Sequence, residues 1–321
     1  MNKLGFWGKI NKPIICLAPM ADVTDCAFRL LIAKYGKPDI FFTEFVSVDG
    51  LAHPEAREKL LIDLKFSENE HPIVAQIFGS KPEKFEEVAR MLVSMGFDGI
   101  DINMGCPVKK VLNQNSCSAL IKSPALAKEI ILATKRGANY NGQNIPVSVK
   151  TRIGMSRVEE MEDWIKQILD VEPAALTVHL RTVKEMSSVP AHWELMKRIV
   201  GIRDEMKVKT LILGNGDVLN IEEAKQKIKE TGCDGVMLGR AIFGNPWLFS
   251  NRIPSLQEKL KVMIEHTKLF EKMLGQHKNF AIMKKHFKAY VNGFEGAKEL
   301  RVKLMEAENA TEVEKIVNDF F

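Results

Sequence analysis

The sequence lacks any long apolar run. None of its hydrophobic stretches approaches the roughly 18 uninterrupted apolar residues that a membrane-spanning helix needs. The segment from Met1 to Pro13 carries three lysines, but it lacks both a continuous apolar stretch and a small-residue cleavage site. It therefore does not read as a secretory signal. We expect a cytoplasmic protein without a membrane anchor.

Cysteines are few, and their arrangement argues against two classes of stabilised fold. Their number is five, which is odd, and no Cys-x-x-Cys pair occurs. A disulfide scaffold and a zinc site are therefore not expected, and we predict no bound metal. We interpret Cys16, Cys26 and Cys233 as inert core residues. The role of Cys117 stays open.

What the sequence does contain is enough apolar material for a large core. Hydrophobic residues make up 45% of the 321 residues and charged residues 27%, which is typical of a globular protein. The formal net charge is +5, which permits a polyanionic partner but does not identify one. The oligomeric state stays open, with a monomer as the simpler expectation.

Short apolar, β-branched runs alternate with amphipathic helical patterns as far as about residue 250, which predicts an α/β protein. Eight such runs favour a (β/α)8 TIM barrel. A doubly wound open sheet is the alternative, but no Gly-x-Gly-x-x-Gly follows the first run, so a dinucleotide-binding fold has no support. The predicted strands are Ile14–Leu17, Ile40–Phe42, Ile73–Ile77, Gly99–Asn103, Pro146–Lys150, Ala175–His179, Thr210–Leu213 and Gly235–Leu238.

The strand pattern stops near Arg252, and helical patterns follow. Glycines and an asparagine punctuate them, which predicts a small all-helical C-terminal domain. We therefore expect a catalytic barrel over residues 1–252 and a helical domain over 253–321. The predicted helices are 256–274, 280–291, 297–307 and 311–320.

Polar residues follow the predicted strands where a barrel builds its active site, at the strands' carboxyl ends. Glycine-containing loops after the last two strands, Asn215-Gly216-Asp217 and Gly239-Arg240, can offer backbone N–H groups and an arginine to a phosphate. Asn-Gly alone is more typical of a tight turn. The pairing of the two loops favours a phosphorylated cofactor.

Three further strand ends carry side chains that suit a flavin ring. Lys150 ends an apolar strand, where a cation would stabilise an anionic reduced ring. A salt bridge to Asp101 is the alternative. Gln76 can contact the edge of the ring, or it can be a structural amide that bonds a loop carbonyl. His179 can contact a phosphate or the ring, or it can be a hydrogen-bonded histidine of the barrel rim.

Cys106 stands between Gly105 and Pro107 in the loop after the fourth predicted strand. A thiol with an ordinary pKa of about 8.5 is mostly protonated at neutral pH, so it can donate a proton. Its place on the catalytic rim distinguishes it from the core cysteines.

Through the motifs that contain these residues, the sequence resembles the tRNA-dihydrouridine synthase family. The Asn-Met-Gly-Cys-Pro string is the most specific element of the resemblance. The motifs that carry it appear in family order, and they are Ala18–Asp25 with Phe28-Arg29, Gln76–Gly79, Ile102–Pro107 with Lys109-Lys110-Val111, Val149–Gly154, His179–Thr182, Gly214–Val218 and Gly239-Arg240 with Asn245-Pro246-Trp247.

The resemblance implies an FMN-dependent enzyme that reduces the C5=C6 bond of specific uridines in tRNA. A hydride would pass from reduced FMN to C6 and a proton from Cys106 to C5, with NADPH as the reductant of the flavin. It also implies that Asn103 and Arg152 lie near the uracil, which must be splayed out of folded tRNA. The residues implied to hold FMN are Pro19, Met20, Ala21, Gln76, Lys150, His179, Asn215, Gly216, Asp217, Gly239 and Arg240.

The helical segment agrees with an RNA partner. From Lys272 to Phe294 it holds five lysines and two histidines but no acid. Phe280, Met283 and Phe287 can face a core, and we expect Lys278, Lys285 and Lys288 to stay exposed and reach phosphates. An ordinary solvated helix face is the alternative. The resemblance at Met283–His286 favours Lys284 and Lys285 as tRNA contacts.

Some positions depart from the family pattern. Ser187 and Val189 replace an aromatic residue and a glycine, and His192 replaces an acid, so the loop over the site is expected to differ in shape. Two other functions stay open: an FMN barrel reductase of a small molecule, and a non-catalytic tRNA-binding protein. The sequence does not indicate which uridine is modified.

Overall fold

Residues 4–250 and 252–320 are described by the structure, which is a computed structural model. Their central feature is a parallel sheet in which the eight predicted strands follow one another in the order β1-β11-β10-β9-β8-β5-β4-β2. An isolated β-bridge between Cys16 of β1 and Ile40, the residue before β2, closes the ring. The barrel strands are β1 (Ile14–Leu17), β2 (Phe41–Phe42), β4 (Ile73–Phe78), β5 (Gly99–Met104), β8 (Val147–Arg152), β9 (Ala175–His179), β10 (Leu211–Asn215) and β11 (Gly235–Leu238).

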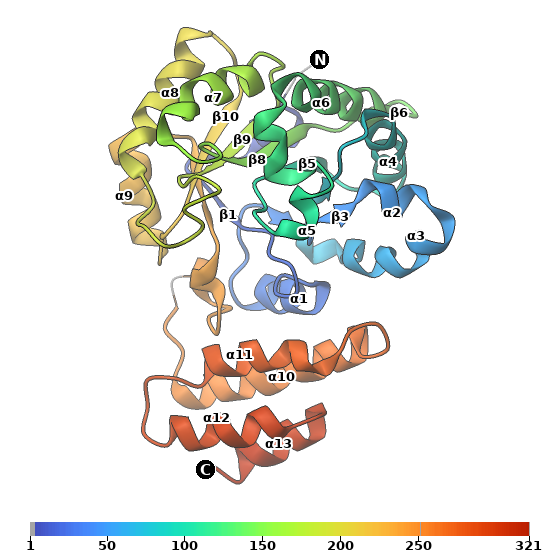
Figure 1. The fold of residues 1–321 in the computed structure, drawn as a ribbon. Helices are drawn as coiled ribbons and strands as arrows, with labels where there is room; N and C mark the ends of the chain where they lie inside the picture. Colours follow the sequence, from blue (N-terminus) through green and yellow to red (C-terminus); the bar gives the residue numbers. More distant parts are fainter. Residues whose placement is uncertain (1–3, 251, 321) are drawn as a thin grey trace.

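Helices surround this ring, as Figure 1 shows. Three further short strands accompany the barrel strands: β3 (Val46–Ser47) pairs with β4, and β6 (Asn139–Tyr140) pairs with β7 (Gln143–Asn144) in a separate hairpin. The predicted TIM-barrel fold is thereby confirmed. The helices of this part are α1 (Cys26–Tyr35), α2 (Val48–Ala52), α3 (Pro54–Leu60), α4 (Pro82–Ser94), α5 (Lys109–Leu112), α6 (Pro124–Ala138), α7 (Met161–Leu169), α8 (Met196–Glu205) and α9 (Ile221–Thr231).

Two buried clusters explain why the strands read as continuous apolar runs. Along β1, Ile15 and Leu17 pack in the cluster that includes the surrounding helices, whereas Ile14 and Cys16 belong to the second cluster, with inward-facing residues of other strands. Because successive side chains of a strand point to opposite faces, a strand covered on both sides is apolar throughout. The barrel strands therefore lack the alternation of apolar and polar residues that is typical of a strand with one exposed face.

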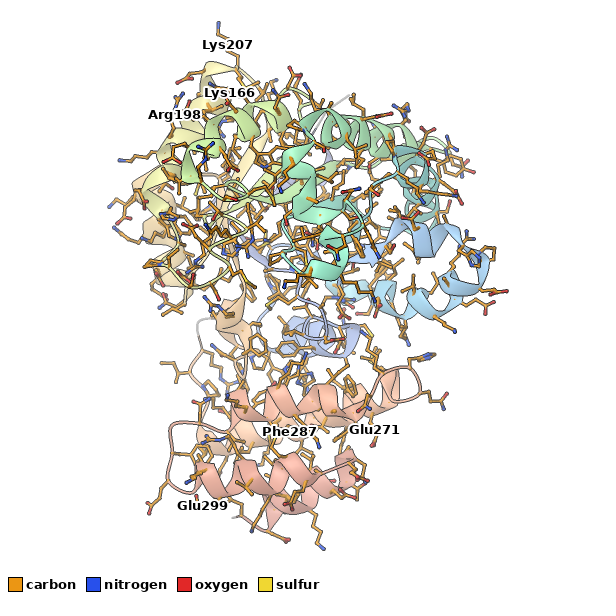
Figure 2. All side chains as sticks on the ribbon, viewed as in Figure 1. Lys166, Arg198, Lys207, Glu271, Phe287 and Glu299 are labelled. Atoms are coloured by element: carbon orange, nitrogen blue, oxygen red, sulfur yellow. The ribbon has the colours of Figure 1, made fainter. Side chains whose placement is uncertain are left out.

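Four helices follow the barrel and lie together below it in Figure 1, with α1 facing them. They are α10 (Leu256–Leu274), α11 (Met283–Tyr290), α12 (Ala297–Glu306) and α13 (Ala310–Asn318), and the short 3-10 helix η9 (Phe280–Ile282) precedes α11. Ser255 and Glu258 form a capping box that starts α10. Phe287 is fully buried within this layer, whereas Lys207 projects from the opposite end of the molecule (Figure 2). The division into domains at residue 252 stays a prediction.

The helical layer is fixed to the barrel by stacked rings and ion pairs. Phe28 of α1 stacks on His266 at 4.6 Å between ring centroids. Lys278 forms ion pairs of 2.7 Å with Glu44 and with Asp63, and its side chain is only 12% exposed. The expectation that Lys278 is an exposed phosphate contact is therefore wrong, because tertiary contacts with the barrel occupy its ammonium group.

Helices long and apolar enough to cross a membrane are absent from the described part of the chain.

Candidate active site

A cavity of about 580 Å³ opens at the carboxyl ends of the barrel strands. It brings together most of the residues predicted to hold a cofactor, from the ends of β8, β9 and β10 and from the loops that follow β1, β10 and β11. The predicted site residues that line it are Pro19, Met20, Lys150, Arg152, His179, Asn215, Gly216, Asp217, Gly239 and Arg240. The remaining ones, Ala21, Gln76, Asn103, Cys106, Lys284 and Lys285, do not line it.

The loop after β10 forms one wall and requires its glycine. Gly216 has φ +129°, and a Cβ there would lie 2.8 Å from the Ala191 Cβ atom. Its carbonyl oxygen accepts a hydrogen bond from Trp193 Nε1 at 2.8 Å. Neighbouring Asn215 donates to the Met237 carbonyl at 2.7 Å and accepts from Lys150 Nζ at 3.1 Å. Both Asn215 and Gly216 are thus held at fixed positions in the cavity wall.

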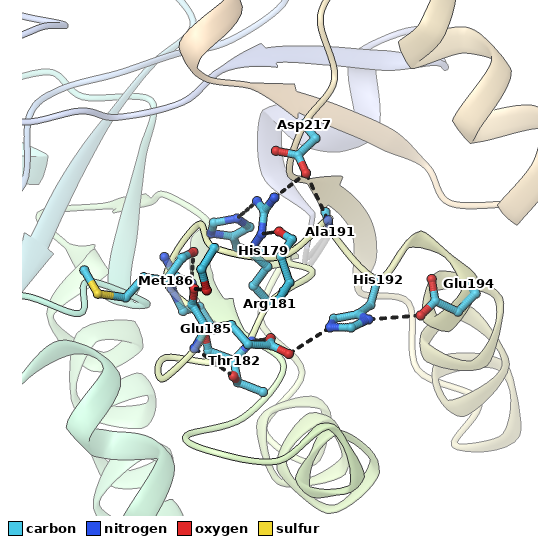
Figure 3. A network of polar contacts seen from close by, with 12 residues as sticks. His179, Arg181, Thr182, Glu185, Met186, Ala191, His192, Glu194 and Asp217 are labelled. Atoms are coloured by element: carbon cyan, nitrogen blue, oxygen red, sulfur yellow. Dashed lines mark hydrogen bonds and ion pairs between the residues drawn. The ribbon is translucent and has the colours of Figure 1, made fainter.

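An ion-pair network lies beside this loop (Figure 3). Asp217 pairs with the buried guanidinium of Arg181 and also accepts hydrogen bonds from Arg240 Nη2 at 2.7 Å and from the Ala191 N–H at 2.9 Å. Partial burial opposes ionisation of Asp217, but these hydrogen bonds hold the pKa of the carboxyl below its usual value. Arg181 was not predicted as a site residue, although it follows His179 by two positions and lines the same cavity.

The cavity carries an excess of positive charge. Lys150, Arg152, Arg181 and Arg240 line it, and Asp217 is the one acid among the described lining residues. Burial, with Arg152 nearby, lowers the pKa of Lys150 to about 8. Such a concentration of cations in a partly desolvated pocket favours an anionic ligand.

His179 takes a defined tautomer in this surrounding. Burial and the neighbouring cations, Lys150 foremost, lower the pKa of His179 to about 2, so its ring is neutral. Its Nε2 atom lies 3.3 Å from Arg181 Nη1. A guanidinium cannot accept a hydrogen bond, so Nε2 accepts and the ring proton is on Nδ1. The ring therefore adds no further positive charge to the cavity.

The buried amides lie in a network of their own. Gln76 donates to Asp101 Oδ2 at 2.7 Å and accepts from Asn103 Nδ2 at 3.0 Å. Asp101 accepts a second hydrogen bond from Ser148 at 2.6 Å, and burial raises the pKa of its carboxyl to about 6. Lys150 is bonded to Asn215, and no ion pair between Lys150 and Asp101 occurs in the described residues. Gln76 is itself fully buried, so its predicted cofactor contact stays a prediction.

Hydrogen bonds hold the loop that carries Cys106. Asn103 Oδ1 accepts from the backbone N–H groups of Gly105 at 3.0 Å and of Cys106 at 3.1 Å. Arg152 Nε donates to the Gly105 carbonyl at 3.0 Å, and its Nη1 atom donates to the Met186 carbonyl at 3.1 Å. Arg152 therefore connects the loop of Cys106 to the loop after β9.

The Cys106 thiol is half-buried next to Pro107, which lines the cavity. A hydrogen bond with the buried thiol of Cys117 lowers the pKa of Cys106 to about 6, against the effect of partial burial, and Arg152 contributes in the same direction. The expectation of an ordinary thiol pKa for Cys106 is therefore wrong. Sequence reasoning missed this contact because nothing in the chain spacing places Cys117 beside Cys106.

The other cysteines agree with their interpretation as core residues. Cys16, Cys26 and Cys233 are buried and free, and burial raises the pKa of each thiol.

The sequence departs from the family pattern in the loop after β9. There a histidine contacts two glutamates. His192 contacts Glu185 Oε1 at 3.0 Å through Nε2 and Glu194 Oε1 at 3.1 Å through Nδ1 (Figure 3). The contact with Glu185 raises the pKa of His192. The Val189 carbonyl accepts from Arg181 Nε at 2.6 Å, and Ser187 lines the cavity. The departing residues thus shape the cavity wall.

Sequence comparison places this chain among known proteins. Residues 16–321 match the sequence profile of a family described as "Dihydrouridine synthase (Dus)". A protein of Staphylococcus aureus (strain Mu50), named "Probable tRNA-dihydrouridine synthase", is 43% identical over 321 residues, which cover 99% of this chain and 96% of that protein. A protein of Bacillus subtilis (strain 168), named "Probable tRNA-dihydrouridine synthase 2", is 40% identical over 318 residues, with coverage of 98% and 96%.

Solved structures share the fold at low sequence identity. Histamine dehydrogenase from Rhizobium sp. 4-9 superposes with a TM-score of 0.54 at 12% identity, over 80% of this chain and 48% of that one. A 2-naphthoyl-CoA reductase gives a TM-score of 0.52 at 12% identity, over 74% and 49%. This chain spans about half the length of either structure, and the likeness shows the fold alone. Because the family profile and relatives of at least 40% identity cover almost the whole sequence, this chain belongs to the dihydrouridine synthase family.

Proposed function

We propose that this protein reduces the C5=C6 bond of specific uridines in tRNA to 5,6-dihydrouridine, with FMN as cofactor and NADPH as reductant. Family membership and the names of the close relatives support the reaction. The observation that carries the proposal is a cation-lined cavity at the carboxyl end of a closed barrel, beside which Asn103 and Arg152 hold the loop of Cys106.

The residues of the cavity fit FMN. A phosphate suits the loop of Asn215 and Gly216 together with Arg240, since this part combines fixed backbone with a largely exposed guanidinium. Lys150 is a partly buried cation without a carboxylate partner in the described residues, which suits an electron-rich ring edge. When bound and reduced, FMN supplies the hydride for C6 of uracil.

Cys106 is proposed to deliver the proton to C5. A thiol with a pKa of about 6 is mostly ionised at neutral pH and cannot donate. Negative charges of a cofactor phosphate and of tRNA phosphodiesters would raise that pKa, because like charge disfavours the thiolate. We therefore infer that Cys106 holds its proton in the loaded complex. Arg152 and Asn103, which fix the loop of Cys106, are proposed to lie near the uracil.

The helical part is proposed to bind tRNA as a domain of residues 253–321, beside a catalytic domain of residues 1–252. On α11, Lys285 is exposed and Lys284 is half-buried, whereas His286 and Phe287 are buried. This division gives the helix a basic outer side, which suits contact with phosphates. The target base is proposed to be splayed out, because an enzyme cannot reach the reacting atoms of a base that stays stacked.

The test is direct. The FMN-loaded protein is incubated with NADPH and an unmodified tRNA transcript, and the nucleosides are analysed by mass spectrometry. We expect dihydrouridine in the transcript and none from free uridine. Cys106→Ala should retain FMN, seen by its visible absorbance, and lose roughly 100-fold or more in turnover. Equal reduction of free uridine would instead favour a small-molecule reductase, and a colourless protein that binds tRNA would favour a non-catalytic role.

A further inference from the structure

A second thiol lies against the proposed proton donor. Cys117 opens the 3-10 helix η4 (Cys117–Lys122), and its side chain contacts the thiol and the backbone of Cys106. The next residue, Ser118, donates through Oγ to the Cys106 carbonyl at 2.7 Å. Residues 117 and 118 at the start of η4 thus both contact Cys106. These contacts hold the two sulfur atoms close to each other.

The backbone of Cys117 makes this contact unusual. Its φ is +54°, a left-handed conformation that glycine, asparagine and aspartate adopt far more readily than other residues. Among the non-glycine residues of positive φ in the described ranges, Cys117 is the one that is fully buried. A glycine would fit this backbone without strain, yet the chain carries a thiol there, in contact with another thiol.

The two thiols differ in access and in charge. Cys106 is half-buried beside Pro107, which lines the cavity, and the cations Arg152 and Lys150 favour its thiolate. Cys117 is fully buried, and its contact with Cys106 raises the pKa of its own thiol. An accessible thiolate beside a protected second thiol is the arrangement in which the first is oxidised and the second resolves it.

We propose that Cys106 and Cys117 form a peroxide-responsive pair that closes reversibly into a disulfide. That closure would block turnover, a consequence that rests on the proposed role of Cys106 as proton donor. The pair itself does not depend on that role.

The chemistry balances with hydrogen peroxide as the oxidant. The Cys106 thiolate attacks one peroxide oxygen, so an S–O bond forms, the O–O bond breaks, and the departing hydroxide takes a proton to become water. The Cys117 sulfur, giving up its proton, then attacks the sulfenic sulfur of Cys106. An S–S bond forms, the S–O bond breaks, and a second water leaves. Two thiols lose two electrons in total and one peroxide gains them, and a dithiol such as dithiothreitol reverses the change.

The experiment uses the full-length FMN-loaded protein, reduced and then freed of reductant. It is titrated with hydrogen peroxide, its remaining thiols are blocked, and its peptides are mapped by mass spectrometry. We expect a peptide pair linked through Cys106 and Cys117, a loss of two hydrogen masses from the intact chain, and full reversal by dithiothreitol. Sulfinic acid on Cys106 with Cys117 still reduced would overturn the proposal.

Two variants sharpen the result. Cys117→Gly suits the left-handed backbone and removes the resolving thiol, so peroxide should convert Cys106 to sulfinic acid that dithiothreitol does not reduce. Cys233→Ala, a matched change at another buried cysteine, should still give the linked peptides. Full reversibility in Cys117→Gly would count against the pair. The peptide map of the unaltered chain decides the question if Cys117→Gly does not fold, and it does so even if the protein reduces no uridine.

Discussion

Lys150 and Asn215 meet across the mouth of the barrel, where the ammonium group donates to the amide oxygen at 3.1 Å. The two residues belong to β8 and β10, which flank β9 in the sheet. A neutral amide oxygen compensates a buried cation only in part. The lowered pKa of Lys150, caused by burial and then by Arg152, reflects this deficit. Asp101 and Cys106 offset the deficit only in part, so the site favours a further anion such as the proposed FMN.

Lys150→Met tests this arrangement through two opposite effects. Removing a poorly compensated cation should raise the free energy of unfolding of the FMN-free protein by about 1 kcal/mol. It should also weaken FMN binding by roughly tenfold or more, because the electrostatic contact is lost. Urea unfolding and a fluorescence titration with FMN measure the two quantities. Lys197→Met, at an exposed position of α8, is the control, and a loss of stability in Lys150→Met would contradict the argument.

The pKa of Cys106 predicts how its reactivity depends on pH. Only the thiolate is alkylated, so the rate of reaction with iodoacetamide should reach half of its maximum near pH 6 in the unliganded protein. In Cys117→Gly the hydrogen bond that lowers the pKa is absent, and the midpoint should move upward toward about 8.5. Stopped-time alkylation followed by mass spectrometry measures the rate at Cys106 alone. A midpoint near 8.5 in the unaltered protein would falsify the assigned contact.

Asp217 should contribute to stability at neutral pH and lose that contribution in acid. Its pKa is lower in the folded chain than in the unfolded one, so its stabilising effect is complete above the unfolded value of about 3.9 and disappears as the pH falls through the folded value. Asp217→Asn leaves the buried Arg181 without its anion. We expect a loss of about 1–2 kcal/mol at pH 7, smaller than for a fully buried pair because Asp217 is 34% exposed.

Urea unfolding at pH 7 and near pH 2.5, which is below the unfolded pKa of about 3.9, measures this effect. The difference between Asp217→Asn and the unaltered protein should shrink at the lower pH. Asp204→Asn provides a comparison at a carboxylate that is 63% exposed on α8. An unchanged difference at both pH values would show that the carboxylate charge is not what stabilises Arg181.

Much of the barrel could be predicted because its strands are buried on both faces. The runs at 14–17, 175–179 and 235–238 have the predicted bounds, since an uninterrupted apolar run leaves little doubt where such a strand lies. The strand predicted to end at Leu213 continues to Asn215 instead. Polar residues that belong to the site extend the strand, and apolar patterning cannot detect them.

The features that sequence reasoning missed all depend on contacts between distant segments. Arg181 lines the cavity and pairs with Asp217, and Cys117 affects Cys106 through a thiol contact. Lys278 reads as one lysine among several on a basic stretch, yet its partners lie in the barrel. Residue type and spacing do not encode such partners.

Lys278→Met tests whether this lysine fastens the helical layer to the barrel. The change leaves Glu44, whose side chain is 6% exposed, without the ammonium group that compensates it. We expect the free energy of unfolding to fall by about 2 kcal/mol. Limited proteolysis should also cut the segment before α10 faster. Lys288→Met, on the exposed side of α11, should change neither measurement.

The proposed tRNA contacts predict a different result for the neighbouring lysines. Lys284→Gln and Lys285→Gln each remove one positive charge without disturbing Met283 or Phe287, which are buried in the helical layer. Each change should weaken tRNA binding roughly three- to tenfold at low salt and reduce the slope of log affinity against log salt by about one, because one fewer phosphate counterion is released. FMN content should not change.

Filter binding of a tRNA transcript over a range of salt concentrations measures both quantities. Lys207→Gln is the matched control, because Lys207 lies at the end of the molecule opposite the helical layer (Figure 2). If all three variants weaken binding equally, the loss reflects net charge and not a contact surface. An unchanged salt slope in Lys285→Gln would remove α11 from the proposed interface, because an exposed lysine that meets a phosphate necessarily releases a counterion.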